Sequence, residues 1–507
     1  MKPFIVTITL LFNCFSFAEW PQGGGPSGDF SVDQKYPTKW SVATDQNIAW
    51  KLTLPETGQS TPVVSKGKVF FSTMKQVQKD TKLASDIVAW CVDEGSGKVL
   101  WKRPVPGKYP LRISGAFSDS SSPPAVCDGS RVIFTNASGK IICFDYEGNQ
   151  LWQRDLLTVG RSVPFLHEGK FIFTIHRYPP EEGKFPHTNK DAPLEKWTQL
   201  QALNIETGKP VWTTSCGLNM GCAIVPQTLS DGRRVVLVGR GGGHSPPERP
   251  EGVSLVNLKY GTTIWTLPLE GYMSTQTNLI RNDFVHLFHK SSHITVDALT
   301  GQIESEISII DDIPTRKRKG DIWASASVTL ESKKGRMITQ GSNLLVGKYH
   351  YFRSYTSPYI GRVNVDSKKV EYLELPLQVS RAPGEAEQWK WYVEPQSKDE
   401  PEMRLQFFAE NEMKNSRGFV VFDDARSKGN GWGHIAAPTM TVAGDFLYIP
   451  VMSGTTYVIR HDVKTLDEKA IEAINDLGVV GKSWTRSSIS FSDGKAYLCF
   501  YLRHDQV

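Results

Sequence analysis

The sequence has little of what marks several common classes of enzyme and binding protein. Its 507 residues include seven cysteines but no Cys-x-x-Cys, so neither a dithiol redox motif nor c-type haem attachment is indicated. Neither Gly-x-Ser-x-Gly nor His-Glu-x-x-His occurs, which leaves no serine-hydrolase or zincin signature. No catalytic residue is assigned, and an enzyme is not the favoured class.

Charge of one sign is not concentrated either. The net charge of +5 is spread along the chain, and the longest basic run is Arg316–Lys319. Nucleic acid normally requires a clustered basic face, so it is not an expected partner, and we interpret the run as a solvated loop. His286 and His289 would lie on opposite faces of a strand, so no metal site is expected there.

Only the N-terminus carries a long apolar stretch. Lys2 precedes apolar residues 4–17, and Ser16-Phe17-Ala18 is a small-x-small cleavage site, which together predict a signal peptide over residues 1–18. Residues 19–507 then form an exported domain, periplasmic or extracellular. No stretch is long enough for a transmembrane segment. Cys14 lacks the small residues that precede a lipidated cysteine, so a lipid anchor is not favoured.

Six cysteines remain after the signal peptide, and their even number leaves a disulfide open in an exported chain. Cys216 and Cys222 are the closest pair in sequence. The alternative is that the cysteines are buried free thiols, since several lie in apolar, strand-like runs.

Glycine and tryptophan recur at a fixed spacing. An acidic or amide residue is followed by glycine three or four residues later, and by tryptophan four residues after that. The four copies are Asp93-Gly97-Trp101, Asp145-Gly148-Trp152, Asn204-Gly208-Trp212 and Asn257-Gly261-Trp265. A fifth copy, at Asp297 and Gly301, has Ser305 in place of tryptophan. Copies are separated by about 40 to 60 residues, which is typical of propeller blades.

The motif has a structural interpretation. The Asp or Asn side chain accepts hydrogen bonds from the following backbone, and glycine supplies a positive φ in the hairpin turn. The tryptophan begins the outer strand and is expected to lie on the neighbouring blade, where it buries a large apolar area. These glycines and tryptophans therefore dock blades and do not catalyse.

Short β-branched and aromatic runs around each motif predict four strands per repeat. The fold class is all-β, a single β-propeller of eight four-stranded blades, with seven blades as the alternative. Residues 47–52, which include Trp50, are the expected N-terminal strand that completes the last blade and closes the ring. Residues 380–429 form a loop insertion, a sixth blade begins near Trp323, and a short helix is expected over residues 466–477.

The repeats resemble the pyrroloquinoline-quinone-like (PQQ-like) β-propeller family, most clearly over Ala89–Trp101 and Ala202–Trp212. Exported bacterial members of that family include quinoprotein dehydrogenases and scaffold propellers for outer-membrane-protein assembly. The dehydrogenases use a vicinal disulfide and Ca²⁺, and this chain has no adjacent cysteines. The resemblance therefore implies a scaffold without a cofactor, with PQQ and calcium as the alternative.

Candidate ligand-binding residues lie where inner strands are expected to begin, at the mouth of the central channel. Aligning the repeats places Gln59, Ser121, Arg161, Ser274 and Arg486 there, with His434 one residue away. These arginines and the histidine suit an anionic group or an acidic protein loop, although contacts between blades would explain them equally. Arg240 and His244 flank three glycines whose amides would suit an anion, or else simply form a loop.

The favoured function is non-catalytic binding or scaffolding, by a monomer or by a subunit of a cell-envelope complex. Its partner would be a protein, or a small anionic or sugar ligand. One alternative is a PQQ-dependent oxidoreductase. A second is a carbohydrate-binding or carbohydrate-active propeller that uses the tryptophans between Trp389 and Trp432.

Overall fold

A computed structural model describes most of the chain. The described residues are 19–115, 119–159, 162–176, 182, 198–214, 216, 223–241, 249–272, 277, 279–331, 338–339, 341–355, 357–391, 413–421 and 438–502. They form β-strands joined by turns, together with a single 3₁₀ turn at Glu468–Ala470. The predicted signal peptide lies outside these ranges.

Antiparallel sheets follow one another along the chain, and we call them blades in chain order. The first blade contains β2 (Val63–Ser65), β3 (Lys68–Met74), β5 (Ile87–Asp93) and β6 (Val99–Val105). The second contains β8 (Val126–Cys127), β9 (Arg131–Asn136), β10 (Lys140–Asp145) and β11 (Gln150–Asp155). The third contains β13 (Phe165–His167), β14 (Lys170–His176), β15 (Gln199–Asn204) and β16 (Pro210–Thr213), and β12 (Thr158–Val159) also pairs with β14.

The next blades repeat this order. The fourth contains β17 (Pro226–Thr228), β18 (Arg234–Arg240), β19 (Gly252–Asn257) and β20 (Thr263–Pro268). The fifth contains β21 (Leu279–Arg281), β22 (Phe284–His289), β23 (Ser292–Asp297) and β24 (Ile303–Ser308). The sixth contains β27 (Leu344–Val346), β28 (Tyr349–Arg353), β29 (Tyr359–Asn364) and β30 (Val370–Glu374), extended by β25 (Ile313–Lys319) and β26 (Ile322–Val328).

The seventh blade contains β33 (Thr441–Ala443), β34 (Phe446–Pro450), β35 (Thr455–Arg460) and β36 (Ile471–Asp476), with β1 (Ser31–Val32) parallel to β33. Shorter pairs follow or lie beside the blades: β38 (Ser490–Ser492) with β39 (Lys495–Tyr497), β37 (Ser483–Trp484) with β40 (Tyr501–Leu502), β31 (Gln378–Ser380) with β32 (Gln388–Lys390), and β4 (Leu83–Ala84) with β7 (Leu111–Arg112).

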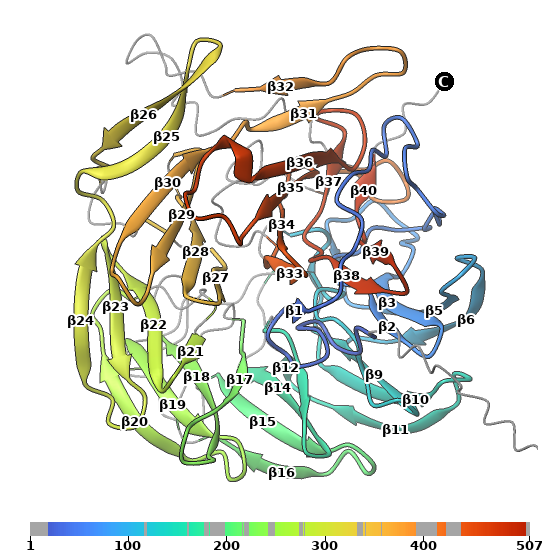
Figure 1. Cartoon of the computed structure of the whole chain (residues 1–507). Helices are drawn as coiled ribbons and strands as arrows, with labels where there is room; N and C mark the ends of the chain where they lie inside the picture. Colours follow the sequence, from blue (N-terminus) through green and yellow to red (C-terminus); the bar gives the residue numbers. More distant parts are fainter. Residues whose placement is uncertain are drawn as a thin grey trace, which may run out of the picture.

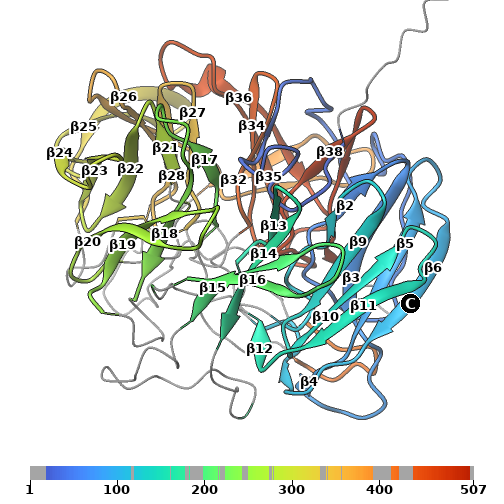
Figure 2. The same cartoon turned by 90° about the horizontal axis from the view of Figure 1, so that it is seen from below.

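The blades surround a common centre. Figure 1 shows β17, β21, β27 and β33 nearest the centre, and β16, β20 and β24 at the periphery. Figure 2 shows the same ring from below. The predicted all-β propeller is therefore confirmed. The number of eight blades stays a prediction, because a last blade is represented among the described strands only by the β38–β39 pair.

Burial follows the position of each strand within its blade. Second strands are almost wholly buried, as in β3, where only Lys68 has appreciable exposure. Outermost strands alternate, as in β11. A strand flanked on both sides by other strands and on both faces by other blades is shielded from water, whereas an outer strand keeps one face exposed to solvent.

The tryptophan of each motif copy reaches the next blade. A methyl group added at Gly208 would lie 2.6 Å from the ring of Trp152, and one at Gly148 would lie 2.9 Å from Trp101. The indole nitrogens of Trp101, Trp152 and Trp265 donate across the same junctions, with Trp152 Nε1 to Ile205 O at 2.8 Å. Each glycine also has a positive φ, for example 66° at Gly208. Glycine is thus required both by the backbone conformation and by the ring above it.

Trp50 makes the same contact at the junction that closes the ring. Its ring would lie 2.7 Å from a methyl group at Gly97, and its Nε1 donates to Glu94 O at 3.0 Å. The expected strand at residues 47–52 is nevertheless not formed, since residues 48–54 belong to no ladder. Trp50 therefore packs on the first blade as predicted, but the segment around it is an extended chain without a paired neighbour and not a strand.

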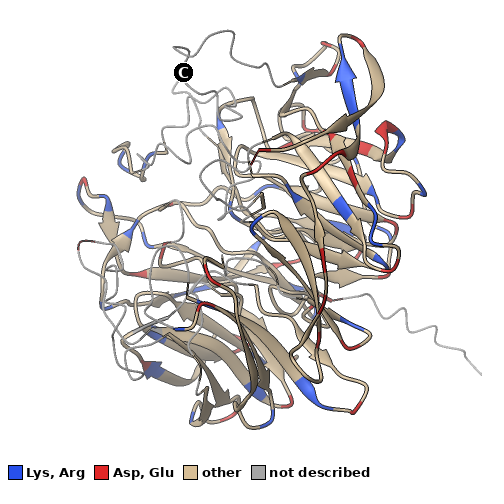
Figure 3. Cartoon of the chain, turned by 90° about the vertical axis from the view of Figure 1, so that its left-hand side faces the viewer, with Lys and Arg blue, Asp and Glu red and all other residues tan. Residues whose placement is uncertain are grey.

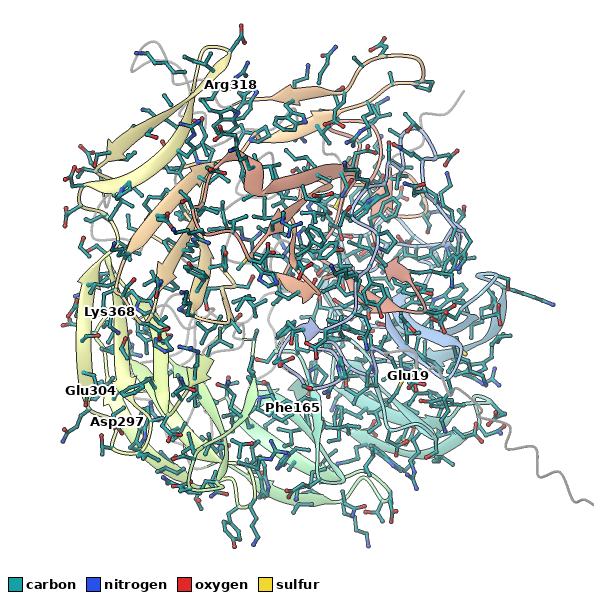
Figure 4. The ribbon with its side chains drawn as sticks, in the orientation of Figure 1. Glu19, Phe165, Asp297, Glu304, Arg318 and Lys368 are labelled. Carbon is teal, nitrogen blue, oxygen red and sulfur yellow. The ribbon has the colours of Figure 1, made fainter. Side chains whose placement is uncertain are left out.

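The junction between the fifth and sixth blades lacks a tryptophan, and the opposite position changes with it. Ser305 occupies the tryptophan position, and Lys368, with φ 61°, stands where other blades have glycine. Lys368 Nζ donates to Thr295 Oγ1 at 3.3 Å. Figure 4 labels Lys368 between these two blades. Without an indole ring above it, this turn has room for a lysine side chain.

Three local expectations were wrong. The helix expected over residues 466–477 is only a 3₁₀ turn followed by β36, because pairing with β35 outweighs helix propensity. The basic run expected in a loop lies in β25, where Arg316 makes two 2.6 Å hydrogen bonds to Glu468. The sixth blade has its inner strand at β27, so Trp323 belongs instead to the β25–β26 hairpin that extends it.

The glycine under an indole ring can be tested by substitution. Gly208→Ala should lower the free energy of unfolding through backbone strain, about 1–2 kcal/mol, and through overpacking against Trp152, about 1–3 kcal/mol. Gly169→Ala is the matched control, because Gly169 has φ 69° but an added methyl group there would meet no atom within 4 Å. Urea unfolding followed by tryptophan fluorescence measures both. Equal losses would show that the ring contact contributes nothing.

Candidate functional site

Three of the predicted channel-mouth residues meet at one side of the ring. Gln59 precedes β2, Ser121 precedes β8 and Arg486 precedes β38, so each lies at the start of an inner strand. The backbone N–H of Gln59 donates to Ser121 Oγ at 3.0 Å, and an Arg486 nitrogen donates to Gln59 Oε1 at 3.1 Å. Gln59 therefore links the starts of three successive inner strands.

A buried carboxylate lies behind this cluster. Asp119 is fully buried, and its Oδ1 accepts from Ser121 N at 2.9 Å and from Ser121 Oγ at 2.6 Å. Its Oδ2 accepts from Ser114 N at 3.2 Å. Burial raises the pKa of Asp119, while the hydrogen bonds from Ser121 and Ser114 and the charge of Arg486 lower it. These donors satisfy the carboxylate, so Asp119 organises the loop.

The sequence contained a weak signal for Asp119, which was not predicted. It stands in the serine-rich run Ser118–Ser122, and an aspartate among serines commonly folds its own loop by accepting from the next residues. The same pattern occurs in ordinary surface turns, so the role of Asp119 in joining two blades can be seen only in the structure.

A segment of the predicted insertion lies against the first blade beside this cluster. Ser416 N donates to both carboxylate oxygens of Glu56, at 3.2 and 3.1 Å, and Asn415 Nδ2 donates to Thr81 O at 3.2 Å. Arg417 forms an ion pair with Asp80 at 3.2 Å. The insertion follows the sixth blade in sequence, so residues 413–421 place material from across the ring next to the predicted channel mouth.

The other predicted binding residues lie elsewhere. Arg240 is nearly buried, and its guanidinium donates to Pro250 O, Arg249 O and Ser254 Oγ at 3.0, 2.7 and 3.3 Å. It therefore holds the fourth blade to the segment before β19. Arg161, Ser274, His244, His434 and Trp432 lie outside the described residues, as does Cys222, while Cys216 has a free thiol.

Tryptophans near the predicted sugar-binding surface contact one another. The rings of Trp323 and Trp391 are 5.5 Å apart and edge-to-face, and Trp389 is 6.1 Å from Trp391. The guanidinium of Arg318, labelled in Figure 4, lies 4.7 Å from the Trp391 ring centre. These contacts join the β25–β26 hairpin to the β31–β32 hairpin and occupy much of the aromatic surface.

A buried cluster of three histidines lies between the fifth and sixth blades. His293 Nε2 lies 3.1 Å from His350 Nδ1, and the rings of His286 and His293 stack at 5.6 Å. His350 Nε2 contacts Asn343 Oδ1 at 2.8 Å. The sequence drew attention to His286 with His289, but the partners of His286 are contributed by two other strands. No group of side chains within the described ranges is arranged to hold a metal ion.

Burial keeps this cluster uncharged. The pKa of His286 is lowered from its usual 6.5 to about 4, chiefly by burial and also by the nearby charges of Lys368 and Arg281, while Asp366 opposes the shift. The pKa values of His293 and His350 are also lowered by burial, and the neighbouring histidines add to the effect. The cluster is therefore neutral at pH 7.

Charged residues of both signs are interspersed on the side of the ring shown in Figure 3. The described part of the chain contains no helix with the length and apolar character needed to cross a membrane.

Comparisons with known proteins agree with the repeat pattern. Residues 38–158 and 84–280 match the family model PQQ_2, described as outer membrane protein assembly factor BamB. Comparison with curated proteins gave no significant match. The matched residues cover just under half of the chain, and together with the succession of four-stranded blades they support a β-propeller of the PQQ-like repeat family.

Solved structures with similarity to this chain include BamB and two dehydrogenases. BamB from Moraxella catarrhalis is 11% identical, with a TM-score of 0.41, and the alignment covers 83% of this chain and 92% of that one. A europium-containing methanol dehydrogenase is 11% identical, with a TM-score of 0.49 and coverage of 91% and 86%. Quinohemoprotein alcohol dehydrogenase from Comamonas testosteroni is 12% identical, with a TM-score of 0.48 and coverage of 93% and 74%.

The histidine cluster should make stability depend on pH. A histidine whose folded-state pKa is lowered stabilises the fold while neutral, and that contribution is lost as the pH falls below 6.5 towards about 4. His286→Phe should therefore reduce the loss of unfolding free energy between pH 7.5 and 4.5 by roughly 2–3 kcal/mol. Denaturant titrations at both pH values measure this, with His289→Phe as the control. An unchanged pH dependence in His286→Phe would contradict the assignment.

Proposed function

We propose that this protein is an exported, non-catalytic propeller that binds a partner protein at its channel mouth, beside Gln59, Ser121 and Arg486. The observation that carries the proposal is the position of Arg486. Its half-buried guanidinium is oriented by Gln59 where the loops of three inner strands meet. An arginine held in this way is suited to an acidic loop, because a pre-oriented guanidinium loses less freedom on binding a carboxylate.

Two further observations support binding over chemistry. The family model that matches this chain is described as an outer membrane protein assembly factor. In addition, segment 413–421 lies beside the cluster and is fixed by Glu56 and Asp80. A mouth built from blade loops together with an insertion offers a broad surface rather than a narrow substrate pocket, and repeat proteins commonly use such surfaces for partners.

The cofactor of the quinoprotein members does not fit this cluster. The buried carboxylate available near the mouth, Asp119, already accepts hydrogen bonds from Ser121 and Ser114, whereas a calcium ligand must direct its oxygens at the ion. No two of the described cysteines are adjacent in sequence, and Cys91, Cys127 and Cys143 are buried free thiols in three different strands. We therefore propose that the protein functions without PQQ.

The cofactor proposal has a direct test. Purified protein mixed with PQQ and Ca²⁺ should keep its melting temperature within about 1 °C, because a ligand that binds only the folded state would raise it. The same sample should not reduce an electron-accepting dye when alcohols are added. A raised melting temperature or dye reduction would support the oxidoreductase alternative instead.

The channel-mouth proposal is tested through Arg486. Arg486→Gln should weaken binding of an acidic peptide such as hexaglutamate at least tenfold, because loss of an oriented charged contact costs about 1.4 kcal/mol or more. Arg233→Gln is the control, since Arg233 lies in the turn at the other end of an inner strand. Isothermal titration at low and high salt measures both. If the two variants bind equally well, the mouth is not the binding site.

Partners from a cell-envelope extract can be compared by the same pair of variants. Proteins retained by the wild type and by Arg233→Gln but lost with Arg486→Gln would be ligands of the channel mouth. Retention of the same set by all three proteins would contradict the proposal.

A further inference from the structure

The β25–β26 hairpin reaches past the end of the blade that it extends. β25 is paired with β30 at Thr315 and Arg316, and the partner of Arg316 is the last residue but one of β30. The turn that joins β25 to β26 lies several residues further on, at Gly320 and Asp321. Figure 1 shows the hairpin at the periphery of the propeller, on the far side of β30 from the centre. The turn and the residues beside it therefore form a projecting tip.

This tip exposes an apolar side chain. Ile322 is 66% exposed, which is the largest exposed fraction among the large apolar side chains of the described residues. It is paired across the hairpin with Lys319, so the two side chains lie on the same face. Burying Ile322 would stabilise any complex that covers the tip, because apolar surface would leave water.

Three tryptophans, none of them fully buried, lie together next to the tip. The ring of Trp323, the residue after Ile322, is 5.5 Å from the ring of Trp391. The ring of Trp391 is 6.1 Å from that of Trp389. Tryptophan is enriched where one end of the side chain is in an apolar medium and the other in water, as at the boundary between a lipid bilayer and water.

The charge beside these rings is positive. The basic run 316–319 lies on β25, and Figure 3 shows it as a blue stretch on one strand near the upper edge of the view. Its two arginines form ion pairs with acids, Arg316 with Glu468 and Arg318 with Asp321. Lys317 and Lys319 form no ion pair with any described residue. The acid at the tip is thus neutralised, and the lysines are not.

Other charged groups near the tryptophans follow the same pattern. Glu374 accepts from the backbone N–H of Arg318 at 2.8 Å, and Glu387 forms an ion pair with Arg381. Lys390 stands between two of the tryptophans in sequence, and its Nζ donates to an uncharged amide oxygen at 3.1 Å. The carboxylates therefore have donors opposite them, whereas the lysines supply the surplus charge.

We propose that the β25–β26 hairpin rests on an anionic membrane surface, with Ile322 inserted among the lipids, the tryptophans at the level of the headgroups, and the lysines against lipid phosphates. An acidic polypeptide would neutralise Lys317 and Lys319 but leave Ile322 in water. A bilayer offers negative charge at its surface and hydrocarbon directly beneath it. Long lysine side chains can follow the apolar residues inward and keep their ammonium groups among the phosphates. The proposal does not depend on binding at the channel mouth.

Sedimentation with lipid vesicles tests the proposal. The full chain should sediment with vesicles of phosphatidylcholine and phosphatidylglycerol, and at least tenfold more weakly with phosphatidylcholine alone, because each basic side chain near an anionic surface strengthens binding about fivefold. The charged vesicles should also slow amide hydrogen exchange in residues 318–323, since the tip leaves water. The exchange experiment needs only wild-type protein, so it remains decisive if a variant does not fold.

Matched variants locate the contact. Lys317→Gln combined with Lys319→Gln should weaken binding to the charged vesicles at least tenfold, and so should Ile322→Asp, which removes the inserted side chain and adds a repelled charge. Lys98→Gln and Leu100→Asp are the controls and should each change binding less than about twofold. Both residues are exposed, Leu100 by 46%, and they lie at β6, across the propeller from the hairpin (Figure 1).

Several outcomes would overturn the proposal. They are absence of vesicle binding, equal binding to neutral and charged vesicles, wild-type binding by Ile322→Asp, and protection of amides elsewhere in place of the tip. If hexaglutamate binds the wild type, loses affinity when Lys317 and Lys319 are replaced, and no vesicle binds, the hairpin would be a site for an acidic polypeptide instead.

Discussion

The propeller depends on an indole side chain that packs on a glycine of the following blade. The lower residue has no Cβ and has a positive φ that turns the backbone beneath the indole. At the contacts of Trp50, Trp101, Trp152 and Trp265, a backbone carbonyl also accepts the indole N–H. Trp101 satisfies all three with Gly148 and Tyr146 O. Because each pair joins neighbours only, the fold is a chain of nearest-neighbour couplings. The pair formed by Trp50 and Gly97 joins the ends of that chain.

Two junctions show how far this contact governs the rest. Between the fifth and sixth blades the indole is absent, and a lysine and three buried histidines occupy the interface. That junction combines neutral imidazoles with the packed rings of Phe288 and Phe352, whereas each junction among the first five blades has an indole lying on a glycine. Where the propeller closes, the indole is present but the strand is not: Trp50 packs on the first blade, although the main chain around it belongs to no ladder. Docking between blades therefore does not require a complete ladder within each blade.

The sequence predicted the architecture because the docking motif is local. Asp93, Gly97 and Trp101 span nine residues, and a turn with a fixed spacing can be recognised from one chain. The last strand of the seventh blade was mistaken for a helix because residues 466–477 have helical propensity, and only the neighbouring strand opposes it. The basic run in β25 was missed for the same reason, since its partner Glu468 lies far away in sequence.

The candidate site was predictable only in part. Aligning the repeats brought Gln59, Ser121 and Arg486 to equivalent positions, and equivalent positions of a ring are neighbours in space. Asp119 and the contact of Ser416 with Glu56 depend on loops without a repeat, so no internal alignment places them. The histidine cluster likewise unites three strands of two blades, and spacing within one strand pointed to the wrong pair.

The docking pair also defines what can be removed from such a ring. Since the indole belongs to one blade and its glycine to the next, the exchangeable module is not a sheet but a segment running from one glycine turn to the next. Deleting the residues between Gly148 and Gly208 would leave Trp101 facing an equivalent turn. A deletion that followed the sheet boundaries would instead separate an indole from the glycine on which it packs. A blade can therefore be inserted or deleted in this propeller only as a segment that runs from one glycine turn to the next.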